Sequence, residues 1–164
     1  MAVSESPRKA TGPKMRIFFT ISLEGLDKYS LDTVKAHAVT DGLRRAFPDD
    51  DDDELAMIAL LAAADDNIRD GGDEPFRLVL AADADTSQQD TDDPSLVEVA
   101  APVLWSDVAA IFVDDDDVRD DVLAARRGDD DAFDRLAGHD MLWYDPTERI
   151  RLAVELRDRI GRQH

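Results

Sequence analysis

The stretch FRLVLAADADTSQQDTDDPSLVEVAA, residues 76–101, holds two apolar segments with no helical pattern between them. Residues 76–82 and 96–101 carry Leu, Val and Ala at consecutive positions, and we expect each segment to be a strand. The polar run between them, residues 83–94, is too long for a tight turn and predicts an exposed hairpin loop. Because strands joined by such a loop pair antiparallel, the sheet is not wholly parallel.

Three more strands are predicted on either side of this hairpin. RIFFTI at residues 16–21 and VAAIFV at residues 108–113 are apolar at successive positions, which is typical of strands buried on both faces. HDMLWY at residues 139–144 is expected to be the last strand, centred on MLWY at residues 141–144. Together these segments predict a five-stranded sheet.

Helical patterns lie between and after the strands. Residues 52–70 begin with acids that suit a first helical turn, continue as an Ala- and Leu-rich run, and stop before two glycines. Residues 118–136 are predicted to form helix on both sides of a breaking glycine. A C-terminal helix is expected over residues 146–162, where Asp and Pro stand at the start. Residues 31–47 fit either a strand or a helix.

These elements fit one α+β domain. A chain of 164 residues has the size of a single ordinary domain. We expect residues 15–164 to form two layers, with helices packed on a mixed, mostly antiparallel five-stranded sheet. Residues 1–14 are rich in Ser, Pro, Lys and small side chains, and are predicted to be a flexible leader.

The charge of the chain excludes several classes of protein. Its net charge is −19, from 38 acidic and 19 basic residues, and 31 of the acids are Asp. Such a surface repels phosphates, so we expect neither nucleic acid nor an anionic membrane as a partner. The lack of cysteine excludes disulfides and thiolate chemistry. No apolar run reaches the roughly 18 residues of a membrane helix, and no secretory signal is recognised, so a cytoplasmic location is predicted.

Four aspartates are candidates for a metal site. Asp83 and Asp85 follow one predicted strand, and Asp114 and Asp116 follow another. Carboxylates gathered where strands end bind Mg²⁺ through their oxygen atoms. The alternative is that the first pair begins a solvated loop while the second pair caps a helix. No other cofactor is expected, although dense acid runs bind Mg²⁺ or Ca²⁺ weakly.

Two histidines and three aromatic residues are further candidates for chemistry or binding. His37 or His139 beside an acid could act as a general base, but neither accompanies a recognisable nucleophile, and a structural position is the simpler interpretation. Trp105, Trp143 and Tyr144 could line a ligand pocket or an interface. In a chain with only ten aromatic residues, we expect Trp143 to fill the core instead.

Several blocks of the chain are similar to a known family. They are MRIFF at residues 15–19, VLWSDVAAIFVDD at residues 103–115 and HDMLWY at residues 139–144, of which the last two are the most specific. Over residues 15–145 the chain resembles an uncharacterised family of small acidic actinobacterial proteins. The resemblance implies one common type of small domain and assigns no catalytic residue.

The motif content favours binding over catalysis. The patterns of phosphate-binding loops, zinc proteases and serine hydrolases are absent. Residues 1–16 carry four bases and one acid, and residues 146–164 carry five bases and three acids. Basic ends on an acidic body fit pairing within the chain, a homodimer, or an acidic protein partner. We expect a non-enzymatic interaction or regulatory domain; the alternative is a small Mg²⁺-dependent hydrolase or phosphotransferase using the four aspartates.

Overall fold

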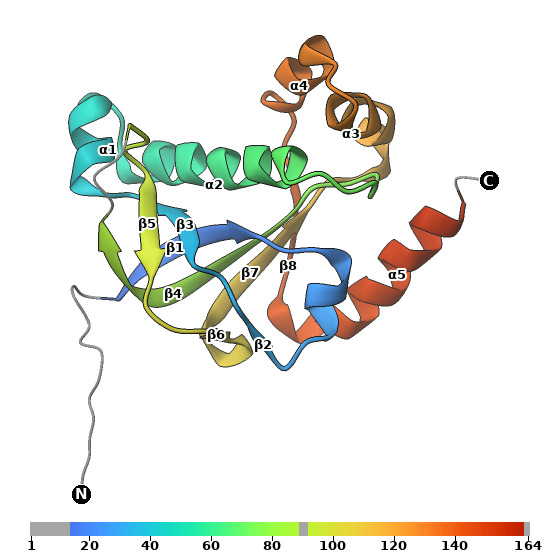
Figure 1. The fold of residues 1–164 in the computed structure, drawn as a ribbon, viewed down its shortest axis with the longest axis horizontal. Helices are drawn as coiled ribbons and strands as arrows, with labels where there is room; N and C mark the ends of the chain where they lie inside the picture. The colour runs from blue at the N-terminus through green and yellow to red at the C-terminus, as the bar shows by residue number, and fades with distance from the viewer. Residues whose placement is uncertain (1–13, 89–91, 163–164) are drawn as a thin grey trace, which may run out of the picture.

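The structure, a computed structural model, describes residues 14–88 and 92–162 (Figure 1). Its strands are β1 (Lys14–Thr20), β2 (Ser30–Leu31), β3 (Lys35–Ala38), β4 (Leu78–Gln88), β5 (Leu96–Val99), β6 (Val103–Leu104), β7 (Val108–Val113) and β8 (Leu142–Tyr144). Its α-helices are α1 (Asp41–Ala46), α2 (Asp52–Arg69), α3 (Arg119–Arg126), α4 (Asp130–Leu136) and α5 (Arg149–Gly161). Short 3-10 helices are η2 (Leu23–Asp27), η3 (Trp105–Asp107), η4 (Asp116–Val118) and η5 (Pro146–Glu148). The α+β class is confirmed.

The main sheet has six strands in the order β1-β3-β5-β4-β7-β8, and every pairing within it is antiparallel. β1 also pairs with β4, so that β1, β3, β5 and β4 close into a ring. The sheet therefore has one strand more than the sequence predicts, because the ambiguous residues 31–47 supply β3 as well as helix α1. β2 and β6 form a separate two-stranded sheet.

β4 extends further than expected. Residues 83–88, predicted to be the start of a loop, continue the strand and pair with β1 and β5. Ala84 and Thr86 are buried, whereas Asp83 and Asp85 are partly exposed. The aspartates thus occupy the outward positions of a strand whose side chains alternate between the two faces. Because every second residue is charged, the segment contains no continuous apolar run and does not look like a buried strand.

Helices cover both faces of the sheet (Figure 1). Phe18, Val79 and Ala81 face α2, on which Ala59, Leu60, Ala63 and Ala64 pack against them. The opposite face contributes to the larger core, which also contains Leu152, Ala153 and Leu156 of α5. Consecutive residues of a strand point to opposite faces, so strands that are apolar at every position need cover on both sides.

Local sequence explains where α2 begins. The Asp51 carboxylate accepts a hydrogen bond from the Glu54 N–H at 2.9 Å, and the Glu54 carboxylate accepts one from the Asp51 N–H at 2.8 Å. This reciprocal capping satisfies two N–H groups that have no partner inside the helix. Burial of each leucine on the inner side of α2 adds about 1.5–3 kcal/mol.

The predictions for the two ends of the chain, a flexible leader and a C-terminal helix, compare differently with the structure. Of the predicted leader, only Lys14 is described, and it is the first residue of β1. The C-terminal helix is present as η5 followed by α5. Among the helices of residues 14–88 and 92–162, none is both long enough and apolar enough to cross a membrane.

Candidate functional site

The four candidate aspartates do not gather at one place in the sheet. β4 and β7 are antiparallel, with Leu78 opposite Val113 and Ala82 opposite Val108. Asp114 therefore lies beside Arg77, before β4 begins, whereas Asp83 lies six residues further along β4, at a separation of ~20 Å. Within the described residues, no group of three or more His, Asp or Glu side chains is arranged to hold a metal ion.

Asp114 is instead half of a buried ion pair. Its side chain is 0% exposed and that of Arg77 is 1% exposed. Arg77 donates from Nε and Nη2 to the two carboxylate oxygens, each at 2.8 Å, and its backbone N–H donates to Oδ2 at 2.8 Å. The Asp114 carbonyl accepts a bond from buried Arg159 Nη1 at 2.6 Å. Both carboxylate oxygens are therefore occupied by donors, which gives Asp114 a structural role.

The other three candidates, Asp83, Asp85 and Asp116, each lie beside a basic residue. Asp83 lies directly opposite Arg16 on β1, with 2.8 Å between the carboxylate and Nε. Asp116 accepts a bond from Arg119 Nη1 at 3.0 Å. Asp85 lies opposite Lys14 on β1. Weak binding of Mg²⁺ or Ca²⁺ to the acidic surface stays a prediction.

His37 belongs to a cluster that the sequence does not reveal. Its ring is 3% exposed, with Nδ1 2.7 Å from Ser95 Oγ and Nε2 2.7 Å from Asp66 Oδ2. The Ser95 hydroxyl donates its one proton to Asp93 Oδ1 at 2.8 Å, so it acts as an acceptor toward His37. Both ring nitrogens are therefore engaged, Nδ1 with the Ser95 hydroxyl and Nε2 with the Asp66 carboxylate.

This Ser–His–Asp grouping is not arranged for nucleophilic catalysis. A nucleophilic serine gives its proton to the histidine, whereas Ser95 directs its proton to an aspartate. Ser95 is also only 2% exposed and lines none of the surface hollows described below. The cluster joins β3, α2 and the segment before β5, and its role is structural.

Two of the three candidate aromatic residues have structural roles. Trp105 donates from Nε1 to the Lys28 carbonyl at 2.8 Å, and the Arg149 guanidinium lies 4.5 Å from the centre of its ring. Tyr144 packs against the larger core. Trp143, predicted to be a core residue, is 59% exposed. Adjacent strand residues point to opposite faces, so Tyr144 takes the inward position and Trp143 the outward one.

The basic residues of α5 are engaged within the chain. Arg149 donates to the Leu26 carbonyl, Arg157 pairs with Asp27, and Arg159 contacts the Asp114 carbonyl. Of the three arrangements predicted for the basic C-terminal end, pairing within the chain accounts for these three arginines.

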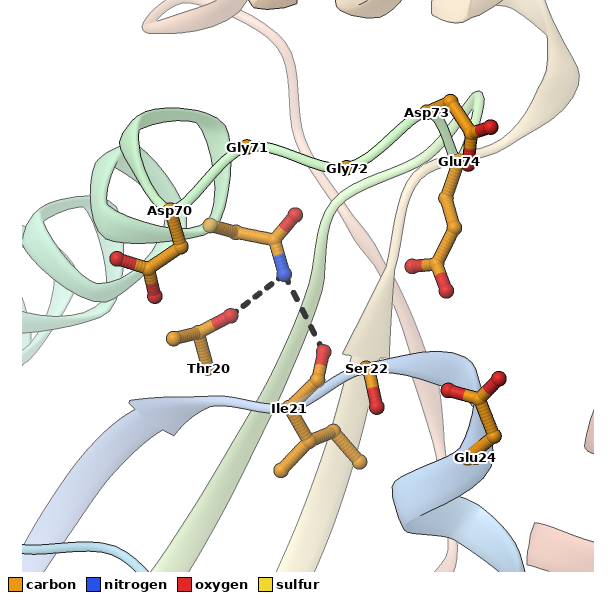
Figure 2. Close-up of a pocket in the computed structure, with 10 residues that line it drawn as sticks. Thr20, Ile21, Ser22, Glu24, Asp70, Gly71, Gly72, Asp73 and Glu74 are labelled. Carbon is orange, nitrogen blue, oxygen red and sulfur yellow. Dashed lines mark hydrogen bonds between the residues drawn. The ribbon is translucent and has the colours of Figure 1, made fainter.

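An acidic hollow of about 430 Å³ opens between the end of β1 and the connection that follows α2 (Figure 2). Residues 20–22 and Glu24 line one side, and Asn67 with residues 70–74 line the other. Gly71 and Gly72 have φ angles of 88° and 93°, which favour glycine at both positions. We call this site the acidic hollow.

Arg126 of α3 holds the far wall of the acidic hollow in place. Its guanidinium donates to the carbonyls of Asn67, Gly71, Glu74 and Phe76, and to the Asn67 side chain, at 2.8–3.0 Å. Asn67 in turn donates to Thr20 Oγ1 and the Ile21 carbonyl, which Figure 2 marks. Because all five N–H groups of Arg126 point to oxygen atoms of the wall, this arginine is not free to bind a ligand.

The carboxylates of the acidic hollow are partly desolvated. Burial raises the pKa of Glu74, although its bond from the Leu23 N–H and the charge of Arg126 oppose the shift. Burial also raises the pKa of Asp70, with a further contribution from Asp66. Four carboxylates, those of Glu24, Asp70, Asp73 and Glu74, line the hollow, but among the described residues no group of three or more His, Asp or Glu side chains is arranged to hold a metal ion.

A second hollow, also of about 430 Å³, is mainly apolar. Its walls are Met57, Leu60 and Leu61 of α2, Phe112 of β7, and residues 137–141, which lead into β8. We call it the α2–β8 groove. Met57 is 47% exposed. Trp143 of the neighbouring β8 is 59% exposed and lies opposite Phe112 in the strand register, whereas Leu142 points to the other face of the sheet.

His139 gives the α2–β8 groove its one unusual polar feature. Its Nε2 atom is the only buried side-chain nitrogen or oxygen without a hydrogen-bond partner among the described residues. The nearest carboxylate oxygen, Oδ1 of Asp115, is 3.5 Å away, which is too long for a good hydrogen bond. The sequence already distinguishes His139 as the histidine just before an aromatic strand, whereas Met57 and Leu61 carry no local signal of exposure.

The fold and these sites define an α+β domain with a small closed ring of strands, a covered sheet and surface hollows that include the acidic hollow and the α2–β8 groove. Residues 15–153 match the model of a family of unknown function, DUF6912, and the chain belongs to this family. The expected relation to an uncharacterised family is thereby confirmed. No curated protein and no solved structure matches the chain.

Proposed function

We propose that the protein is a non-enzymatic, cytoplasmic interaction domain that docks a partner protein in the α2–β8 groove. One observation carries the proposal: the apolar walls of the groove continue outward into exposed Trp143, which lies opposite Phe112 in the strand register. Large apolar side chains that cluster on a surface are costly to hydrate, and such clusters mark interaction sites. Trp and Met are also among the residues enriched in protein interfaces.

The alternative function, a Mg²⁺-dependent hydrolase or phosphotransferase, receives less support. It requires Asp114 to present free carboxylate oxygens, and both of these oxygens accept bonds from Arg77. It also requires Asp83 to lie near Asp114, and the antiparallel register separates them. An interaction domain needs neither condition.

Site-specific photo-crosslinking in the native host tests the proposed function. A benzoylphenylalanine placed at Met57 is expected to give discrete adducts with a partner protein. The matched control is Val154 on α5, which is 58% exposed and lies outside the groove. Adding the groove substitution Leu61→Asp should remove the adducts formed from position 57. No adduct from position 57, or the same adducts from both positions, would contradict the proposal.

A further inference from the structure

We infer that the occupant of the α2–β8 groove is a basic peptide segment of a partner protein, which inserts apolar side chains between α2 and β8 and places Lys or Arg beside the surrounding carboxylates. This inference rests on the proposed function and adds the chemical class of the partner. It differs from the acidic partner that the basic ends of the sequence first indicate.

The apolar wall on α2 has an acid at each end. Asp53, Met57, Leu61 and Asp65 follow one another at intervals of four residues, so they lie along one stripe of the helix. Met57 and Leu61 form the middle of this stripe and line the groove. Asp53 is exposed and Asp65 is partly buried. A peptide lying along the stripe would therefore meet a carboxylate before and after its apolar contacts.

The opposite wall is acidic as well. Asp140 lines the groove and is exposed, and Asp115 lies 3.5 Å from the His139 ring behind it. No lysine or arginine lines the groove. The nearest described base on α2 is Arg69, one turn beyond Asp65, and its guanidinium lies over the Phe133 ring of α4 at 5.4 Å.

Asp65 would gain from an incoming cation. Burial raises the pKa of this carboxyl, while Arg69 and Arg77 oppose the shift without cancelling it. The ionised group is therefore incompletely compensated in the free protein. A partner ammonium or guanidinium nearby would supply part of the missing charge.

Two other occupants fit the observations less well. A second copy of this chain would bring another net charge of −19 toward an already acidic rim, and like charges oppose such an association. A small apolar molecule would fit the volume, but it would leave Trp143 beyond the rim uncovered. A basic segment that also carries apolar residues would cover the apolar wall and exposed Trp143, and its Lys or Arg would pair with the carboxylates.

Selection from a random peptide library tests the inference. A displayed library of peptides of about 16 residues is selected on the wild-type protein, on Met57→Lys, and on Val154→Lys as the control. Both substitutions replace an exposed apolar side chain on a helix and change the net charge equally. Peptides enriched on the wild type and on Val154→Lys, but not on Met57→Lys, report groove binding. We expect these peptides to combine a net positive charge with several apolar residues.

Affinity measurements on an enriched peptide separate charge from apolar contact. Fluorescence anisotropy should show binding weakened by about tenfold or more for Met57→Lys and left within about twofold for Val154→Lys. Replacing the Lys and Arg of the peptide by Gln should weaken binding by about tenfold, and so should a rise from about 50 to 500 mM salt.

The outcomes distinguish the inference from the proposed function. Groove-dependent peptides that are neutral or acidic would overturn the basic partner and leave the docking function intact. A dimer in light scattering that Met57→Lys dissociates would identify a second copy as the occupant and would likewise overturn the inference. If no peptide distinguishes the wild type from Met57→Lys, both the inference and the docking function fail.

Discussion

At the scale of single residues, charged side chains in this protein differ more by environment than by type. Asp114 and Asp121 each accept bonds from both Nε and Nη2 of one arginine, but Asp114 is fully buried with Arg77, whereas Arg135, the partner of Asp121, is mostly exposed. Nothing local in the sequence separates the two aspartates. Their roles depend on which strand or helix lies opposite them, and sequence reasoning therefore missed the ion pair of Asp114.

Replacing Arg77 by Met should destabilise the protein severely. The substitution leaves the Asp114 carboxylate buried without its counter-charge, and such losses cost about 3–5 kcal/mol. Urea denaturation followed by circular dichroism would measure the change in the free energy of unfolding. Arg135→Met at the exposed pair is the matched control and should cost a small fraction of that amount. Equal losses in the two variants would show that burial does not govern these pairs.

Glu74→Gln should make stability less dependent on pH. Because burial raises the pKa of Glu74 in the folded state, the folded chain holds this proton at pH values where the unfolded chain has released it. Stability therefore decreases as the pH rises from the ordinary value of 4.5 through the raised value, and the cost persists at neutral pH. Glutamine keeps an oxygen for the Leu23 N–H and removes the charge.

The free energy of unfolding should be measured for this variant from about pH 2 to pH 7, beside Asp145→Asn. Bonds from the backbone and the side chain of Thr147 lower the pKa of Asp145, so its stabilisation is present above the unfolded value of 3.8 and is lost as the pH falls through the folded value. Asp145→Asn should thus remove a contribution of the opposite sign. A Glu74→Gln profile that parallels the wild type would refute the desolvation of Glu74.

At the scale of helices and strands, local sequence patterns predict an element correctly when its formation does not depend on which other strand or helix it packs against. Helix 52–70 was expected from its acids, alanines and glycines, and α2 ends only one residue earlier. Strand 108–113 was predicted with the bounds that β7 has. The prediction of a loop at residues 83–88 is wrong, because pairing with β1 and β5 outweighs the low strand propensity of Asp.

The five consecutive aspartates of residues 49–53 span the start of α2, and we expect one of them to dominate stability. Asp51→Ala removes the carboxylate that caps the Glu54 N–H, and a lost N-cap costs about 1 kcal/mol. Asp49→Ala removes the same charge two residues outside the capping position. Urea denaturation should show a clear loss for the first variant and almost none for the second. Similar losses in both would mean that net charge, rather than capping, stabilises the start of α2.

At the scale of the whole molecule, the class was predictable and the topology was not. Alternating helical and strand patterns sufficed for an α+β domain, because they reflect local periodicity. Closure of β1 onto β4 joins residues 59 to 71 positions apart, which no local pattern encodes. The α2–β8 groove was missed for the same reason, since its walls come from α2, β7 and the segment before β8.

The large negative charge should make the fold more stable when salt is added. A net charge of −19 on one small domain repels itself in the folded state, and counter-ions screen this repulsion. Thermal melts in about 10 mM and 1 M sodium chloride should show a higher midpoint at the higher concentration. An unchanged or lower midpoint would mean that the screened ion pairs contribute as much as the repulsion does.

Among the residues that the structure describes, ring closure leaves β8 as the open edge of the main sheet. β1 is paired on both sides, by β3 and β4, while β8 ends the order of strands on the other side. An unpaired border is where separate molecules adhere and begin to aggregate. Electrostatic repulsion between highly charged copies opposes association at this edge in dilute buffer. Concentrated salt screens the repulsion and makes association more favourable. The conditions that raise the melting midpoint should therefore also lower the solubility of the protein.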